Sequence, residues 1–207
     1  MHMVSPDLDL VERELRAGRL SCPLCEGRLR PWGWARQRLV RHLGQSERLR
    51  PRRSRCAGCA VTHVLMPVVC LLRRVDAVAV IGAGLLAKGT GQGHRPIAAR
   101  LGRPATTVRD WLRRFAARAE ALRALFTALA LRLDPALDPP PPAGSVVADA
   151  VAAIGVLLTA TRQRFAGAGL VGAVTGWEVA AAASGGRLLS PGWPPVVPGS
   201  VCNTSSP

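Results

Sequence analysis

Two Cys-x-x-Cys pairs constrain the fold of this chain more than any other feature. The first pair is Cys22 and Cys25, the second is Cys56 and Cys59, and residues 26–55 separate them. Each pair can form a tight turn that directs two thiolates toward one metal ion, and two such turns complete a tetrahedral site. The spacing predicts a structural Zn²⁺ site in a small β zinc ribbon. Four cysteines leave no coordination position for water, so we expect no catalytic role for this metal.

The residues around these pairs support the two turns and leave alternatives open. Pro23 would pre-set the first turn, and Gly58 would permit a positive backbone angle in the second. His63 could replace one thiolate as a ligand. A redox pair or a chance clustering of cysteines also remains open, although redox pairs are typical of a single Cys-x-x-Cys motif at a helix start. We interpret Cys70 as a buried small hydrophobe and Cys202 as an idle tail residue.

The positive charge of the chain is concentrated in its first 125 residues. The net charge is +15, and among the 28 basic residues only Lys88 is a lysine. Residues 21–74 hold 12 arginines and two acids, and residues 75–125 hold nine bases and three acids. Such a surplus favours a polyanionic partner. The acidic N-terminus and the lack of a long uncharged apolar stretch predict neither a signal peptide nor a membrane partner, and favour a cytoplasmic, nucleoid-associated protein.

The segment 95–115 has the pattern of a DNA-reading helix-turn-helix. Ala98 would let two helices approach, Gly102 would make the turn between them, and Pro104 suits the start of the second helix. Apolar residues at the spacing of facing helices would fill the angle: Ile97, Leu101, Val108 and Trp111. The second helix of this motif enters the major groove, so the expected partner is double-stranded DNA. An ordinary helical hairpin with a solvated basic face is the alternative.

The expected DNA contacts fall into three groups. Outward residues near the start of the second helix should face bases or phosphates: Thr106, Thr107, Arg109, Asp110 and Arg113. Flanking arginines are better placed for phosphates: Arg95, Arg103 and Arg114. The ribbon should add phosphate contacts through Arg52, Arg53 and Arg55. In this interpretation the ribbon binds the backbone of the DNA while the helix reads its sequence.

The pattern along the chain predicts a mainly α protein with a small β zinc ribbon, an α+β architecture. The expected order is an N-terminal helix, the zinc ribbon, the helix-turn-helix domain, a Pro-rich linker, a small apolar helical region and a disordered tail, over residues 1–20, 21–74, 75–133, 134–144, 145–187 and 188–207. Trp32 and Trp34 lie in the ribbon, where we expect them to cover its small core.

The combination of motifs resembles a known set of proteins. The segments "CPLC", "RPRRSRCAGCAVTHVLMP" and "TVRDWLRRF" resemble the DNA-targeting region of bacterial zinc-ribbon transposases. Over about residues 20–190 the chain is similar to a family of small helix-turn-helix proteins of high-GC, actinobacterial-type genomes, which carry a domain of unknown function. The segments "PWGWARQRLVR", "VIGAGLLAKGTGQGHRPIAARLGRPATTVRDWLRRFAARAEALRALF" and "GWEVAAAASGGRLL" carry this similarity. The resemblance implies zinc and DNA binding.

The sequence favours a binding protein over an enzyme. A full transposase needs three clustered metal-binding carboxylates, and only Asp149 and Glu178 follow the Pro-rich segment. We read Asp149 as a solvent-facing helix residue and Glu178 as a first-turn acid. The expected function is that of a regulator or a mobile-element accessory factor that serves a separately encoded recombinase partner. The alternatives are an RNA-binding or protein-docking adaptor and, behind it, a thiol redox or degenerate nuclease enzyme.

A homodimer is a further expectation, because helix-turn-helix proteins commonly read two half-sites as dimers. The apolar stretch after Phe115 would supply the interface through Leu122, Leu125, Phe126 and Leu129. The same residues could equally pack on the rest of the chain.

Overall fold

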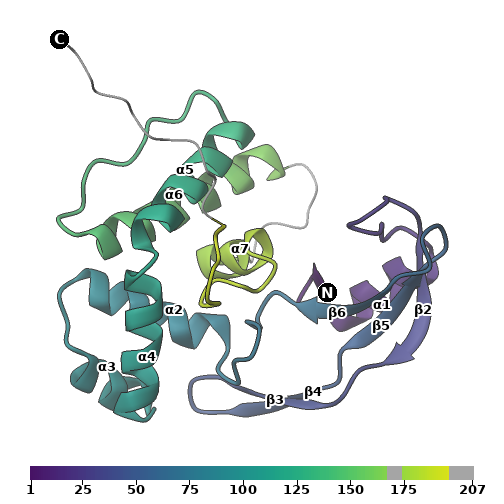
Figure 1. Ribbon diagram of the computed structural model, residues 1–207, viewed down its shortest axis with the longest axis horizontal. Coiled ribbons are helices and arrows are strands. Elements are labelled where there is room, and N and C mark those ends of the chain that lie inside the picture. The colour runs from purple at the N-terminus through teal and green to yellow at the C-terminus, as the bar shows by residue number, and fades with distance from the viewer. Residues whose placement is uncertain (167–173, 196–207) are drawn as a thin grey trace.

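The computed structural model describes residues 1–166 and 174–195, and it places a small sheet beside a group of helices (Figure 1). Four strands form the sheet in the order β1-β6-β5-β2, with β1 parallel to β6 and the other pairs antiparallel. These strands are β1 (His2–Val4), β2 (Leu29–Trp34), β5 (Arg52–Cys56) and β6 (Thr62–Pro67). We call residues 1–67, without the β3–β4 hairpin described below, the cysteine module.

Helix α1 (Leu8–Arg16) supplies part of the core of the cysteine module. Its N-terminus is capped by Asp7, whose side chain accepts a hydrogen bond from the Leu10 N–H. Val11 and Leu15 are one turn apart on its buried face. The whole core consists of Val4, Val11, Leu15, Cys22, Leu29, Cys56 and Leu65. Two of these seven residues are candidate metal ligands, so hydrophobic burial alone gives this module little stability.

The long segment between the cysteine pairs is an extended β structure, and its tip leaves the module. Strands β3 (Arg38–Arg41) and β4 (Ser46–Leu49) form an antiparallel hairpin of their own. Val40 and Leu49 are buried in the core of the helices rather than in that of the sheet. The backbone of Arg41 also exchanges hydrogen bonds with Val75 and Ala77, just before α2. The insert is therefore a docking hairpin, and its partner is the helical part of the same chain.

Six helices form the second and larger part. They are α2 (Val78–Gly89), α3 (His94–Leu101), α4 (Ala105–Ala116), α5 (Ala119–Leu133), α6 (Val146–Arg164) and α7 (Gly176–Ala183). The largest side chains of their common core are Trp111, Phe115 and Phe126, each at most 2% exposed. Within the described residues, the mixture of seven helices and a small mixed sheet agrees with the α+β class expected from the sequence.

The Pro-rich segment 134–144 connects two helices of one core and does not separate two domains. Helices α5 and α6 pack side by side along their length (Figure 1), and Ala150, Ala153, Ile154 and Leu157 of α6 are buried in the same core as Phe126 of α5. The expected boundary at 134–144 is therefore a loop. The small side chains of Ala150 and Ala153 let α6 approach α5 closely. From the sequence, this segment could be recognised only as apolar.

Two expectations for the C-terminal half need correction. Leu188 and Leu189 are 2% and 3% exposed, and Trp193 packs its ring against Phe126, so residues 188–195 belong to the fold rather than to a disordered tail. The rest of that expected tail, with Cys202, lies outside the described residues. Leu122 and Phe126 are fully buried, so they cannot form a dimer interface on the surface.

Helix α6 is the one helix, within residues 1–166 and 174–195, that is long and apolar enough to cross a membrane. Core helices of soluble proteins share this length and composition. One face of α6 packs against α5, α2 and α7. We therefore interpret α6 as a helix of the protein core.

Gly82 is the position at which α2 packs closely against Trp177 of α7. A β-carbon at this position would lie 2.2 Å from the indole ring of Trp177 in α7. Only glycine lets the helix backbone lie flat against that ring. Helix α7 is fixed at the same end, its N-terminus, by a capping box, in which Thr175 and Glu178 satisfy each other's backbone N–H groups. This confirms Glu178 as a first-turn helix acid.

Candidate metal centre and basic surfaces

The four cysteines of the two pairs meet at one end of the sheet. All four sulfur atoms lie within 4.8 Å of one another. The Sγ atoms of Cys22 and Cys59 are 3.8 Å apart, and those of Cys25 and Cys56 are 3.4 Å apart. Four thiolates bound tetrahedrally at the usual Zn–S distance would be separated by about 3.8 Å. The four thiols, none of which is in a disulfide, can therefore hold a metal ion.

The two Cys-x-x-Cys turns have the same backbone geometry. In the first, the N–H of Glu26 donates to the carbonyl of Cys22 at 2.9 Å, and in the second the N–H of Ala60 donates to the carbonyl of Cys56 at 3.1 Å. Both Glu26 and Ala60 adopt a left-handed conformation, with φ of 59° and 60°. Non-glycine residues rarely take this conformation. Its occurrence at equivalent places shows that the two turns have the same conformation, and the short distances between their sulfur atoms show that they face one another.

The glycines of the turns have other roles than the sequence indicated. Gly58 does not have a positive φ, which corrects the expectation that it supplies the special angle of the second turn. Its N–H instead points at the sulfur of Cys56, 3.3 Å away. Gly27 is the position where a side chain is excluded, since a β-carbon there would lie 3.0 Å from the Cys56 sulfur. Its place just after a Cys-x-x-Cys turn was the only sequence signal for this role.

Backbone N–H groups favour the metal-binding form of one thiol. The N–H of Cys59, helped by that of Gly58, outweighs burial and lowers the pKa of the Cys56 thiol to about 6. The N–H of Val61 also favours the Cys59 thiolate, but the hydrogen bond to Cys25 and burial raise the pKa of Cys59 to about 12. Neighbouring thiolates thus oppose full ionisation of the cluster. A divalent cation at its centre would remove that opposition.

His63 lies beside the cluster and not within it. Its side chain is buried in β6, and its Nε2 atom is 3.3 Å from the Cys22 sulfur. Burial lowers the pKa of this imidazole. The four-cysteine set is complete without it, so His63 fits a supporting contact to one sulfur better than a ligand position. Within the described residues, no other group of three or more His, Cys, Asp or Glu side chains has metal-binding geometry.

The helix pair α3–α4 has the packing that the sequence predicts. Gly102 ends α3 in the left-handed conformation, with φ of 61°, and the Arg103 N–H donates to the carbonyl of Ala98 at 3.0 Å. The four apolar residues expected inside the angle are all buried: Ile97, Leu101, Val108 and Trp111. The turn between the two helices is therefore Gly102-Arg103-Pro104, with Pro104 next to the first residue of α4.

The outward face of α4 is basic and open to solvent. Thr106, Arg109 and Arg113 are exposed, as is Arg95 of α3, while Thr107 is half-buried. Asp110 is the only acid of α4, and it pairs with arginines on its own helix and on the segment between β6 and α2: Arg114 at 2.8 Å, Arg113 at 3.3 Å and Arg74 at 3.9 Å. Burial would raise the pKa of Asp110, but the hydrogen bonds from Arg114 and Arg113 outweigh it and lower the pKa. Its negative charge is thus offset locally.

Arg103 has an internal role and is not available to phosphate. Its side chain is 11% exposed and contacts the buried carboxylate of Asp76 at 2.6 Å. It also donates to the backbone carbonyl of His42 at 2.7 Å, while Arg41 of β3 contacts the other oxygen of Asp76 at 2.9 Å. These contacts fasten the β3–β4 hairpin to the α3–α4 turn. They correct the expectation that Arg103 binds DNA backbone, because its partners lie inside the protein.

The three ribbon arginines also divide into internal and external groups. The side chain of Arg52 is 15% exposed and pairs with Glu12 of α1 at 2.9 Å. Because this ion pair holds Arg52 within the protein, the expectation that it contacts phosphate is wrong. Arg53 is half-buried. Arg55 is exposed, and its guanidinium lies 4.8 Å from the ring centre of Trp32.

The two ribbon tryptophans do not cover the core of the module. Trp32 is 52% exposed and Trp34 is 51% exposed. The core of the module contains neither of them. The expectation that they fill a small ribbon core is wrong, because α1 already covers the buried side of the sheet through Val11 and Leu15.

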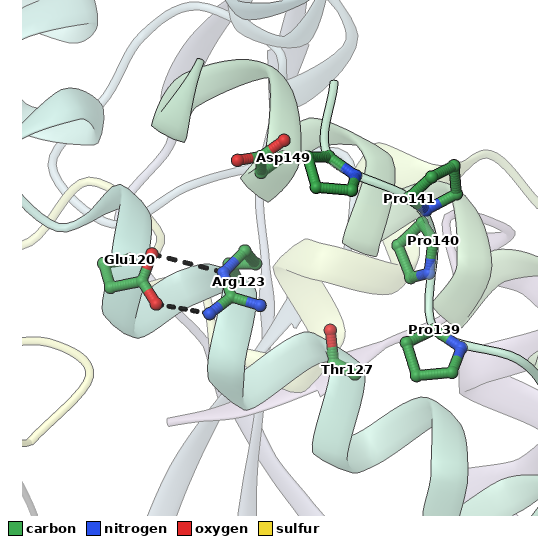
Figure 2. Close-up of a pocket in the computed structure, with 8 residues that line it drawn as sticks. Glu120, Arg123, Thr127, Pro139, Pro140, Pro141 and Asp149 are labelled. Atoms are coloured by element: carbon green, nitrogen blue, oxygen red, sulfur yellow. Dashed lines mark hydrogen bonds and ion pairs between the residues drawn. The ribbon is translucent and has the colours of Figure 1, made fainter. Parts of the chain in front are cut away.

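A pocket between α5 and the Pro-rich segment has no catalytic arrangement (Figure 2). Figure 2 shows the Glu120 carboxylate turned toward Arg123 on one side, and the proline rings of 139–141 on the other. Glu120 forms an ion pair with Arg123, and Asp149 accepts a hydrogen bond from the Ala143 N–H. Asp149 therefore fixes the end of the Pro-rich loop, which gives it a structural role beyond that of a solvent-facing residue.

Comparison with known proteins adds no further assignment. Neither a protein-family model, nor a curated protein, nor a solved structure matches this chain. The function has to be argued from the chain itself.

Proposed function

We propose that this chain is a double-stranded-DNA-binding protein in which α3 and α4 act as a helix-turn-helix. The observation that carries the proposal is the division of α4 into two faces. Val108, Trp111 and Phe115 are buried, while Arg109 and Arg113 point to solvent. A recognition helix needs this division, because one side must be held rigidly while the other enters the groove.

The residues proposed to contact DNA are fewer than those expected from the sequence. Arg109, Arg113 and the threonines at 106 and 107 would face base edges, since arginine can fork onto guanine and threonine can touch a thymine methyl group. Arg95 would bind phosphate. Arg103 and Arg52 are left out because ion pairs hold them inside the protein. Arg114 pairs with Asp110 and would orient that carboxylate instead.

The cysteine module is proposed to be a structural zinc ribbon. Four thiolates that can surround one point tetrahedrally suit Zn²⁺, which has no redox chemistry and is usually four-coordinate in structural sites. Cys22, Cys25, Cys56 and Cys59 would hold the ion, with the His63 imidazole beside Cys22. The metal would supply folding energy to a module whose hydrophobic core is small. We propose no catalytic step for it and no enzymatic role for the chain.

In a cell such a protein would act in the cytoplasm on the nucleoid, as a regulator or as an accessory factor that marks DNA for a recombinase. The chain's basic surplus would bring it to DNA, and the α4 face would select the site. A homodimer would need a surface other than Leu122 and Phe126.

The experiment that tests DNA binding is site selection from random duplexes, followed by binding measurements with the selected site. The variant Arg109→Ala/Arg113→Ala should lose about 10-fold or more in affinity for the selected duplex and lose its preference over unrelated DNA. The control Arg13→Ala/Arg132→Ala removes the same charge from exposed positions on α1 and α5. Equal losses in both variants would reduce the interaction to general charge attraction and sink the recognition-helix assignment.

The metal is tested by elemental analysis of the purified chain. The proposal expects about one zinc per chain, lost in Cys25→Ser and kept in Cys202→Ser. Iron in place of zinc, or a folded module that holds no metal, would contradict the zinc ribbon.

A further inference from the structure

The two exposed tryptophans lie on β2, an edge strand of the sheet, beside arginines that the proposed function leaves unused. We call this edge, defined by Trp32, Trp34, Arg50 and Arg55, the Trp–Arg face. Trp34 is paired in register with Arg52 on the side that α1 covers, whereas Trp32 lies beside Arg55, which alternates to the other side of β5, so the edge presents one ring on each side of the sheet. The Arg55 guanidinium lies 4.8 Å from the ring centre of Trp32, and the Arg50 guanidinium lies 6.0 Å from that of Trp34. Arg52 lies 4.6 Å from the Trp34 ring and is itself fixed by Glu12. Cation–π contacts of this kind hold the rings in place while leaving about half of each side chain exposed.

The backbone of β2 is adapted to present these rings. The pairing of β2 with β5 shifts register between Pro31 and Gly33, so that Trp32 is the extra residue of a β-bulge. Gly33 has a φ of 116°, which only glycine adopts readily. Bulges re-aim a side chain at a cost in strand pairing. The bulge thus leaves Trp32 without a partner in the strand ladder and exposes its large aromatic side chain to solvent. Burial of such a side chain would ordinarily be favoured.

The charge of the Trp–Arg face indicates the chemistry of its partner. The sequences of β2 and β5, LRPWGW and RRSRC, contain no acid. Arg30, Arg36, Arg50 and Arg55 are exposed on or beside these strands. Glu12 of α1, which contacts Arg52 beside Trp34, is already paired with Arg52 and Arg16. A surface of aromatic rings among exposed arginines matches a polyanion that also carries flat rings.

We propose that the Trp–Arg face binds unpaired DNA bases, stacking them on Trp32 and Trp34 while the arginines contact the phosphates. Rings stack on a base only when the base is not already stacked in a duplex, so this surface selects single strands. Figure 1 places β2 at the opposite end of the molecule from α3 and α4. The proposal rests on the proposed function in taking DNA as the partner, but it assigns a second, separate site.

The two sites together would let one molecule hold a duplex and an adjacent unwound strand. The two sites are connected through the β3–β4 hairpin, which Asp76 joins to the α3–α4 turn by ion pairs with Arg41 and Arg103. This arrangement suits a factor that acts where DNA is opened, at a promoter or at the end of a mobile element. The reaction that acts on the same DNA would be one that separates or cuts its strands.

The test measures binding of the full zinc-loaded chain to a 15-nucleotide oligo-dT, to a duplex of the selected site and to oligo-U. Quenching of exposed tryptophan fluorescence reports stacking directly. The variant Trp32→Ala/Trp34→Ala should lose about 10-fold or more in affinity for oligo-dT and change duplex affinity by less than about twofold. The matched control Leu43→Ala removes an exposed apolar side chain, 57% exposed at the tip of the hairpin, and should change neither.

The outcomes separate the two proposals. Arg109→Ala/Arg113→Ala should weaken duplex binding and leave oligo-dT binding in place. A chain that binds oligo-dT through the tryptophans but binds no duplex would reject the helix-turn-helix and keep the Trp–Arg face. Unchanged oligo-dT affinity in the tryptophan variant would overturn the Trp–Arg face, and preference for oligo-U over oligo-dT would overturn its assignment to DNA.

A second variant guards against misfolding of the alanine variant. Trp32→Phe/Trp34→Phe keeps two aromatic rings on β2 and should retain oligo-dT binding within a few-fold, with the fluorescence quenching lost. Retained quenching in this variant would mean that the signal comes from another tryptophan, and would contradict stacking on β2.

Discussion

The cysteine module and the helical part solve the same stability problem in different ways. The helical part buries Trp111, Phe115 and Phe126 in one continuous core. The separate hydrophobic core of the module contains seven residues, two of which are cysteines of the candidate metal site. A small domain with so little apolar burial generally depends on a metal or on a neighbour. The two parts should therefore unfold under different conditions, and four predictions test this difference.

Removing the metal should have the largest effect and should fall on the module alone. Structural zinc sites contribute on the order of 10 kcal/mol to folding. Excess chelator, or Cys59→Ser, should abolish protection of the β5 and β6 amides from hydrogen exchange, while amides of α5 and α6 keep theirs. Cys202→Ser serves as the control. If β5 and β6 stay protected after metal removal, the contrast between the two parts is lost.

Asp76→Ala should break the connection between the two parts. The carboxylate is 3% exposed and joins Arg41 of the hairpin to Arg103 of the α3–α4 turn. Its removal leaves a largely buried guanidinium without its partner, which typically costs about 3 kcal/mol or more. Two unfolding transitions should replace one in calorimetry.

The matched control for this change is Asp9→Asn, an exposed acid in the first turn of α1. It should leave the unfolding curve within about 0.5 kcal/mol of the wild type. A single unchanged transition in Asp76→Ala would show that the remaining contacts, namely the burial of Val40 and Leu49 and the backbone hydrogen bonds of Arg41, are enough to hold the hairpin in place.

Gly82→Ala should destabilise the helical part and leave the module intact. The added methyl group would lie 2.2 Å from the Trp177 ring, so α2 and α7 must separate. Overpacking of this kind typically costs about 1–3 kcal/mol. Thermal unfolding followed by circular dichroism measures it. Gly155→Ala on the exposed side of α6, with nothing within 4 Å, should be neutral or stabilising by about 0.5–1 kcal/mol.

The smallest expected effect is on the stability of the module at low pH, through the Glu12 carboxylate. Burial opposes ionisation, but hydrogen bonds from Arg16 and Arg52 outweigh it and lower the pKa of Glu12. A pKa that is lower in the folded state stabilises the fold above the unfolded value, and this contribution disappears as the pH falls through the folded value. Glu12→Gln should therefore flatten the acid limb of the module's unfolding curve, by less than about 1 kcal/mol.

The sign of this effect is checked by comparing urea unfolding at neutral pH and below the ordinary pKa of glutamate. Wild type and Glu12→Gln should differ at neutral pH and converge in acid. A difference that grows in acid would contradict the ion pair between Glu12 and Arg52.

Local features were predictable because they depend on neighbours in the chain. The four cysteines were predictable from spacing, since each pair is one turn and needs no distant contact. The α3–α4 turn was predictable for the same reason, because Gly102 and its apolar neighbours lie within 15 residues. Even there, the left-handed residue of the second cysteine turn was assigned to Gly58, whereas Ala60 holds it. A local pattern gives the turn, but the position of its strained residue depends on how the sulfur atoms meet.

The candidate ligands, the basic character of the first 125 residues and the buried side of the α3–α4 pair could be predicted from the amino-acid pattern. Which arginines remain exposed depends on long-range packing and could not be predicted from that pattern. Arg103 and Arg109 are alike in sequence, yet one is buried against Asp76 and His42 and the other faces solvent. The same holds for Trp32 and Trp34, whose expected place over the core is taken by α1. Charge and hydrophobicity are properties of the residue, whereas availability to a partner depends on which distant segment packs against it.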